Sequence, residues 1–372
     1  MRLKITPLAF CIAAAACSQS QAAVPLYEEN GWNASVSGSF PVFLVNTDVK
    51  DGEKATRVMS GFNPANLTFG VTAPKEEGLV ISGKMQINNH LQGSQTQNSG
   101  LWESRVAEIQ IDGDFGTVNI GKGFGIFNSS AIGDTGSGLG VGLIGGNVSD
   151  GANATAGRIG TGYVYANFNP RIMYSHSLDS GLSYKVGLFN PEEPTNATAN
   201  DAESPMPRLE GQVNFAMEGM EFWAGFMHQS VNLETDDADY TIQGYDVGAR
   251  VKQGPFGATL AYTITKGIGA DGLYGFGGKE DAEVDGTQWY VEGTYTLNKT
   301  LYGASYGEGA QDENNDPFTV AEQTNSLTML FAHHRVTSHL RTMFEYHTYK
   351  SESGSTTLME YSAVIVGTQL DF

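Results

Sequence analysis

Residues 256–265 read FGATLAYTIT, and residues 288–297 read QWYVEGTYTL. The first stretch alternates Phe256, Leu260 and other apolar residues with small or polar ones, and the second does the same around Trp289. Because successive side chains of a strand point to opposite faces, each stretch has one apolar and one more polar face. A soluble β-sandwich shows the same alternation, so this pattern predicts strands without choosing between a sandwich and a membrane barrel.

The connections between the strands distinguish these two folds. Short turns lie near residues 113–114, 179–181, 219, 254–255, 298–299 and 337–338. Between them lie long polar stretches at 45–64, 91–101, 123–169, 190–206, 232–239, 266–286, 308–322 and 350–355. In an up-and-down sheet every second connection emerges at the same end, so short turns gather at one end and long loops at the other, as in transmembrane barrels. Sixteen strands fit between Trp32 and Phe372, which predicts an all-β, 16-stranded antiparallel transmembrane β-barrel.

Residues 1–22 have the pattern of a secretory signal peptide. Two basic residues precede an apolar run over residues 8–16, and residues 20–22 read SQA, a small-x-small cleavage site. A lipoprotein signal at Cys17 is the alternative, although the usual aliphatic residue three positions earlier is missing. We expect residues 23–372 to form one barrel domain, which contains no cysteine and therefore no disulfide or thiolate metal site.

Composition and charge exclude several classes of protein. Charged residues make up 17% of the chain, and no stretch after residue 23 has the 18 apolar residues that a spanning helix needs. The net charge of −20 leaves no basic surface for nucleic acid. Catalytic serine, zinc-protease and nucleotide-binding motifs are absent, and the neighbouring His333 and His334 point to opposite faces of a strand. We expect no enzyme activity, no catalytic residue, no cofactor and no metal.

The last strand carries a separate signal. Residues 364–372 read VIVGTQLDF, with Leu370 and Phe372 on the same face as the other alternate residues. A chain that ends on an aromatic residue in an alternating strand resembles the recognition signal of bacterial outer-membrane barrels. The resemblance implies that Phe372 and Leu370 form a C-terminal assembly signal for the barrel-assembly machinery, and that the protein lies in the outer membrane.

Residues 104–123 read SRVAEIQIDGDFGTVNIGKG, which resembles the fourth and fifth strands of the Gram-negative general-diffusion porins. Residues 157–160, GRIG, and 169–171, NPR, resemble the return from the long third loop of that family into its sixth strand. In layout the resemblance covers the whole mature chain. It implies a homotrimeric, passive, water-filled channel for small hydrophilic solutes. The third loop, here 123–169, is then expected to fold inward and narrow the pore.

The resemblance also implies a constriction. Lys122 and Arg158 match basic family positions there, and Asp134 and Asp150 are the only acids of the loop. Two further basic positions of the family are neutral in this chain, namely Ser39 and Asn66. Glycines crowd the middle of the loop, so a flexible surface loop is the alternative to inward folding.

Charged residues with inward parity are expected to line the pore, because a charge facing lipid at mid-bilayer costs about 2–4 kcal/mol. They are Lys84, Arg171, Lys185, Asp246, Arg250, Glu292, Arg341 and Glu345. The long loops carry clustered acids, which concentrate cations at the mouth and predict modest cation selectivity. Divalent ions could bridge these acids to outer-membrane lipids and lipopolysaccharide.

Three functions remain open from the sequence. The first is a general-diffusion porin, and the second is a porin specialised for one solute. The third is a non-conducting structural or adhesive barrel that acts through its loops. By analogy with the family, trimers would form through outward-facing residues near the two chain ends, which are Val36, Phe40, Leu67, Phe69 and Val364.

Overall fold

A computed structural model describes residues 23–61, 64–89, 103–136, 157–192, 204–232, 239–272, 284–314 and 320–372. Within these ranges the regular structure consists of β-strands. No helix of the described chain is long and apolar enough to cross a membrane. The expected signal peptide, residues 1–22, and Asp150 lie outside the described residues.

The chain order of the strands follows the expected spacing. They are β1 (Val24–Glu29), β2 (Trp32–Val49), β3 (Lys54–Met59), β4 (Ala65–Thr72), β5 (Val80–Asn89), β6 (Glu103–Gly113), β7 (Gly116–Phe124), β8 (Phe168–Ser177), β9 (Leu182–Phe189), β10 (Arg208–Met217), β11 (Met220–Val231), β12 (Tyr240–Gln253), β13 (Phe256–Lys266), β14 (Asp285–Leu297), β15 (Thr300–Gln311), β16 (Gln323–Arg335), β17 (Leu340–Ser353) and β18 (Thr356–Asp371).

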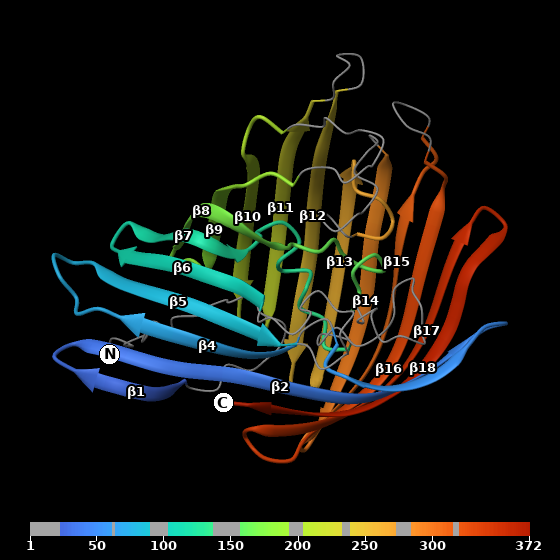
Figure 1. Cartoon of the computed structure of the whole chain (residues 1–372), viewed down its shortest axis with the longest axis horizontal. Helices are drawn as coiled ribbons and strands as arrows, with labels where there is room; N and C mark the ends of the chain where they lie inside the picture. The colour runs from blue at the N-terminus through green and yellow to red at the C-terminus, as the bar shows by residue number, and fades with distance from the viewer. Residues whose placement is uncertain are drawn as a thin grey trace.

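The strands form one closed antiparallel sheet. β9 pairs with β10, and β18 pairs with β2, which closes the barrel (Figure 1). β3 and β4 pair with successive parts of one flank of β2, while β18 and β1 share the other flank. The eighteen strand segments of the described residues therefore fill sixteen positions, which confirms the predicted fold.

The two faces of the wall differ as the alternation predicted. On β13, Phe256 and Tyr262 are exposed on the outer face, whereas Thr263 is buried on the inner face. Phe256 packs against Tyr295 at one level, and Trp289 packs against Tyr306 at another. On β13 these two levels correspond to Phe256 and Tyr262, which pair with Tyr295 and Trp289. They are six residues apart, or roughly 20 Å along the strand, which is close to the height of the apolar band of a transmembrane barrel. The outer face therefore has the dimensions of a membrane-facing surface.

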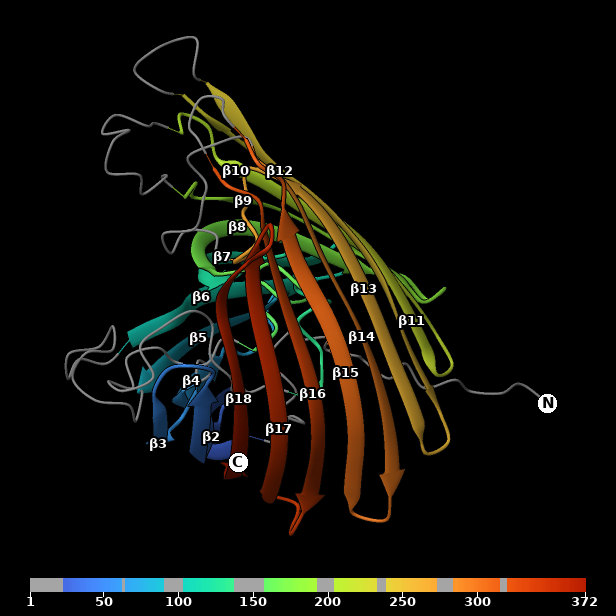
Figure 2. The ribbon, with the colours of Figure 1, turned by 90° about the vertical axis from the view of Figure 1, so that its right-hand side faces the viewer.

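Tight turns predicted from the sequence gather at one end of the wall, as expected. Figure 2 shows the tight turns from β12 to β13 and from β14 to β15 together at one end of the wall. Two expected loops are wrong, however. The stretch 45–64 is mostly a strand hairpin, because β2 continues to Val49 and β3 begins at Lys54, and the stretch 350–355 is a tight turn between β17 and β18. Charged residues at these strand ends made paired strands look like loops.

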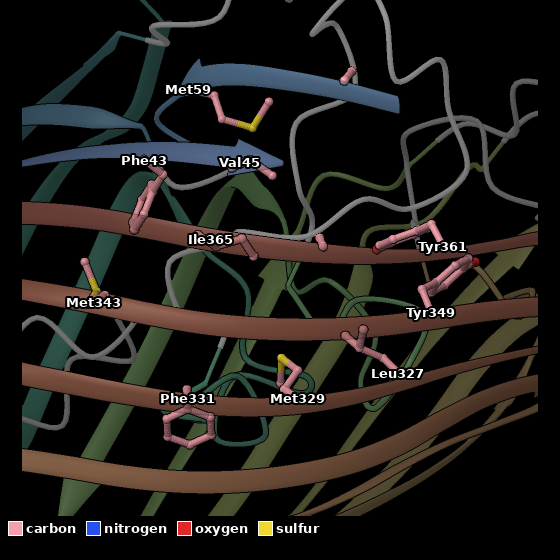
Figure 3. Packing of buried hydrophobic residues seen from close by; sticks show 12 residues of the cluster. Phe43, Val45, Met59, Leu327, Met329, Phe331, Met343, Tyr349, Tyr361 and Ile365 are labelled. Atoms are coloured by element: carbon pink, nitrogen blue, oxygen red, sulfur yellow. The ribbon is translucent and has the colours of Figure 1, made fainter. Parts of the chain in front are cut away.

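Part of the inner wall is apolar. Twelve buried residues from β2, β3, β16, β17 and β18 form one cluster, of which ten are labelled in Figure 3. Phe43, Met329 and Ile365 are each no more than 1% exposed, although they lie on the inner face. The inner wall therefore carries an apolar cluster on this side, whereas the inner wall of β4–β8 is mostly polar.

Candidate functional site

The described ends of the connection between β7 and β8 lie inside the barrel. The backbone N–H groups of Ile126 and Phe127 donate to Oε2 of Glu210 on β10, at 2.6 and 3.0 Å. Ser130 Oγ donates to Oε1 of Gln212 at 3.0 Å. Glu210 and Gln212 belong to the inner face of β10, so this part of the connection is attached to the lumen side of the wall.

The same connection also contacts the next part of the wall. The N–H groups of Thr135 and Gly136 donate to the carboxylate of Glu292 on β14, at 2.8 and 3.0 Å. The Tyr290 hydroxyl donates to the carbonyl of Ala131 at 2.7 Å. Residues 125–136 thus run along the inner wall from β10 to β14. The middle of the expected third loop, 137–156, lies outside the described residues.

Arg158 anchors the returning end of this connection. Its side chain is fully buried. Its guanidinium donates to Ser305 Oγ at 2.6 Å and to the carbonyls of Thr161 and Leu327 at 3.2 and 3.3 Å. It also lies over the ring of Tyr290, 5.5 Å from the centroid. Arg158, which was expected to line the pore constriction, is therefore buried away from solvent and links the connection to strands β15 and β16.

Asp134 lies beside this arginine. Its Oδ1 accepts a hydrogen bond from the Tyr163 hydroxyl at 3.1 Å, and its Oδ2 is 3.9 Å from Arg158 Nε. Burial, reinforced by the negative charge of Glu292, raises the pKa of the Asp134 carboxyl to about 8. The structure thus brings together Asp134 and Arg158, as expected, but in the packing of the connection rather than on an open pore surface.

Lys122 does not join them. In β7 it pairs with Ala107 and Pro170, both exposed. The next position, Gly123, faces inward, because a Cβ there would meet the Arg171 guanidinium and the Glu108 carboxylate. Since side chains alternate along a strand, Lys122 has outward parity. We therefore correct the assignment of Lys122 to the pore constriction. The family match gave the residue type, but the strand register places its side chain on the outer face.

A charged cluster lines the wall of β5, β6 and β8. The Glu108 carboxylate lies 3.1 Å from Lys84 Nζ and 2.8 Å from Arg171 Nη2. Arg171 also donates to the carbonyl of Phe124. The Lys84 side chain is 47% exposed and that of Arg171 only 8%, so Lys84 is the member that an ion in the lumen would meet. Glu108 was not singled out from the sequence, although it shares the inward parity of its partners across the register.

A second cluster connects the wall to the loop. Arg250 pairs with Glu221 at 2.7 Å, donates to the carbonyl of Ser130 at 3.0 Å and lies over the Trp223 ring. Its side chain is 34% exposed. Arg250 therefore both faces the lumen and holds the connection, a dual contact that inward parity alone could not reveal.

Two further predicted pore-lining residues, Glu345 and Arg341, lie on β17, whereas Lys185 lies on β9 and Asp246 on β12. Glu345 accepts hydrogen bonds from two histidines, His333 at 2.7 Å and His347 at 2.9 Å, and all three are nearly buried. Arg341 lies 3.8 Å from a carboxylate oxygen of Asp371. These charges are on the inner face, but their partners hold them within the wall.

Ser39 on β2 and Asn66 on β4, the neutral residues at two positions that are basic in the family, pair with each other. Ser39 Oγ accepts a hydrogen bond from Gln369, which has inward parity, at 2.7 Å. At the C-terminus, Phe372 exchanges two backbone hydrogen bonds with Gly38, and its ring stacks on Phe40 at 5.9 Å. In the described residues no group of three or more His, Cys, Asp or Glu side chains is placed to hold a metal ion.

A closed sixteen-position barrel with an apolar outer belt, a partly polar lumen and a connection packed inside it defines an outer-membrane channel. The chain belongs to the Gram-negative porin family, whose sequence profile matches residues 8–354 of its 372. Its location is therefore the bacterial outer membrane. A comparison with curated protein sequences gave no match.

Solved structures share the fold at low sequence identity. The outer-membrane channel DcaP of Acinetobacter baumannii is 15% identical, with a TM-score of 0.70 over 94% of this chain and 100% of that one. The anion-selective porin from Comamonas acidovorans is 13% identical, with a TM-score of 0.65 over 92% and 100%. The trimer form of OmpT, an outer membrane protein of Vibrio cholerae, is 15% identical, with a TM-score of 0.59 over 92% and 100%. At these identities the likeness concerns the fold alone.

Proposed function

We propose that the protein is a passive, water-filled channel for small hydrophilic solutes and ions, with modest cation selectivity at low salt. One observation carries this proposal. The inner face of β4–β7 remains partly exposed and polar although a connection is packed inside the barrel. Its partly exposed side chains include Thr68, Ser82, Gln86, Gln110 and Thr117. A wall of hydroxyls and amides suits water and hydrated solutes.

The charge balance supports the cation preference. Lys122 has outward parity and Arg158 is buried, so neither supplies a free positive charge to the lumen. The more exposed cations, Lys84 and Arg250, each lie beside a carboxylate. The chain as a whole carries a charge of −20, with clustered acids in the long loops. An unopposed acidic mouth concentrates cations within about 10 Å at 0.1 M salt.

Planar-bilayer recording of the purified protein tests both parts. We expect stepwise conductance and, in a KCl gradient, a reversal potential on the cation side that falls as salt rises. Absence of conductance would favour a non-conducting structural barrel. Block of the current by one solute at low concentration would favour a solute-specific porin, and an anion-side potential at low salt would refute the proposed selectivity.

We further propose a homotrimer, in contact with outer-membrane lipids and lipopolysaccharide, that is exported by means of residues 1–22 and inserted by the barrel-assembly machinery. The inserted barrel is residues 23–372. The trimer form of the Vibrio cholerae protein supports the oligomer, and the contacts of Phe372 with Gly38 and Phe40 support a terminal residue with a defined role in closure.

Phe372→Ala tests the assembly signal. We expect it to lower the amount of protein in the outer membrane while leaving refolding in detergent nearly intact. Leu358→Ala, an exposed apolar position at the start of the same strand, is the matched control. Equal outer-membrane levels of the Phe372 variant and the unaltered protein would exclude a role in recognition.

A further inference from the structure

A second connection also enters the barrel. After β13 the chain turns inward, and Ile268 and Ala270 are 2% and 0% exposed. The Ala270 N–H donates to Gln311 at 2.7 Å, and its carbonyl accepts from Gln288 at 3.0 Å and Asn325 at 3.2 Å. These three amide side chains belong to the inner faces of β15, β14 and β16. The turn is therefore attached to the lumen wall by its own backbone.

This turn is also packed on the first connection. The N–H of Tyr165 donates to the carbonyl of Gly272 at 2.9 Å. Gly160 and Gly272 both have positive φ, 72° and 60°, and a Cβ on Gly160 would lie 2.5 Å from the carbonyl oxygen of Asp271. Only glycines allow this approach of two backbones. The β13–β14 turn therefore also occupies part of the lumen, in addition to the β7–β8 connection that the family resemblance implies.

Asp271 lies at a partly accessible corner of this turn. Its neighbours Ala270 and Gly272 are buried, whereas Asp271 keeps part of its surface accessible. Its Oδ1 accepts hydrogen bonds from Gln323 at 2.9 Å and Asn325 at 3.0 Å. Within the described residues these donors are uncharged amides, which hold the carboxylate in place without neutralising it.

The inward carboxylates that contact or neighbour the β7–β8 connection differ in this respect. Glu108 and Glu221 pair with lysine or arginine, and Glu292 accepts two backbone N–H groups while buried. Their charges are compensated or shielded from the lumen. Asp112 at the turn end of β6 is also held by uncharged groups, Gln110 and Thr117, but it lies on the wall and not on either connection. Since the field of a carboxylate reaches a passing ion only when it is neither paired nor covered, Asp271 is the acid of the two connections best placed to act on ions.

We propose that Asp271 is a cation-selecting residue of the channel, supplied by the β13–β14 connection and positioned by Gln323 and Asn325. This inference rests on the proposed channel function. A unit charge at roughly 10 Å from an ion in water changes the local concentration of that ion by about twofold. The same charge lowers the local concentration of an anion by a like factor, so removing it should lower the cation-to-anion permeability ratio by about fourfold at low salt.

Reversal potentials in a KCl gradient test the proposal with a matched pair of variants. Asp271→Asn removes the charge and keeps an oxygen that can accept both hydrogen bonds. Asp312→Asn makes the same charge change at an exposed position directly after β15, where the Asp312 N–H donates to the carbonyl of Asp285 at the start of β14. We expect the cation-to-anion permeability ratio to fall by about fourfold for Asp271→Asn and by clearly less for Asp312→Asn. Equal shifts, or no shift for Asp271→Asn, would overturn the proposal.

A second measurement keeps the proposal testable if these variants fold poorly. The barrel domain lacks cysteine, so Asp271→Cys can be inserted in a bilayer and then treated with small anionic or cationic thiol reagents. We expect the anionic adduct to restore cation preference and the cationic adduct to reverse it. No response to either reagent would refute a lumen-facing position. Failure of the unaltered protein to conduct would instead refute the channel function itself, so the two failures are distinguishable.

Discussion

At the scale of single residues, Arg158 shows how a charge can serve packing rather than permeation. Arg158→Met keeps the volume but removes four polar contacts and leaves Asp134 without its cation. A buried acceptor that is left without its donor costs about 1–3 kcal/mol. We expect a lower urea midpoint and larger, noisier conductance, with Lys299→Met at an exposed turn as the control. An unchanged midpoint and current would show that Arg158 does not hold the connection.

The buried carboxyl of Asp134 leads us to expect that stability and channel current depend on pH. Its pKa is raised from 3.8 to about 8, so the folded state favours the neutral form, and the associated stability is present at low pH and is lost as the pH rises through about 8. Between pH 7 and 9 we expect current fluctuations to increase as the buried carboxyl ionises. Asp134→Asn, which is neutral throughout, should suppress the increase. The same pH response in both proteins would assign it to another group.

The residue scale also marks where sequence reasoning stopped. Resemblance located Lys122 and Arg158, but it could not show that Lys122 has outward parity or that Arg158 is covered on all sides. Parity depends on the register of β7 between β6 and β8, and burial depends on where a long connection packs. Neither quantity is encoded in the local pattern of residues 104–123.

At the scale of elements, the connection between β7 and β8 is held at a close approach to β16. A Cβ at Gly136 would lie 2.4 Å from the Phe331 ring. Gly136→Ala should therefore displace this end of the connection and change the single-channel conductance, whereas the double variant with Phe331→Ala should recover the original value. Additive effects of the two changes would contradict a direct contact.

Strand alternation predicted the barrel wall well because most strands have one apolar face. It did not predict the apolar inner cluster, since β2, β16 and β18 carry apolar residues on both faces, as Phe43 and Leu44 show. The hairpin of β2 and β3 was missed for a different reason. Its end is rich in charges, and the ion pair of Lys54 with Asp48 at 2.5 Å makes them compatible with paired strands.

At the scale of the whole molecule, the outer face near the chain ends is suited to association. Exposed Phe69, Val71, Met85, Ile109 and Ile120 line a shallow groove of about 560 Å³ on β4–β7. We expect Phe69→Arg to convert the trimer to monomers in mild detergent. Val291→Arg, at an equally exposed site on the distant strand β14, carries the same lipid-side cost and should leave the trimer intact. A monomeric unaltered protein would refute the trimer.

The shared flank of β2 has a consequence for the connectivity of the chain. β18 reaches Ser39 with Asp371, and β1 takes up the same line at Val36 with Val24, so the strand that closes the barrel is assembled from opposite ends of the polypeptide. Around the ring, no strand position is first or last. A circular permutant that links residue 372 to residue 24 and opens the chain within a long loop would retain the strand pairings described here, and the order of the gene would become irrelevant to the shape of the pore.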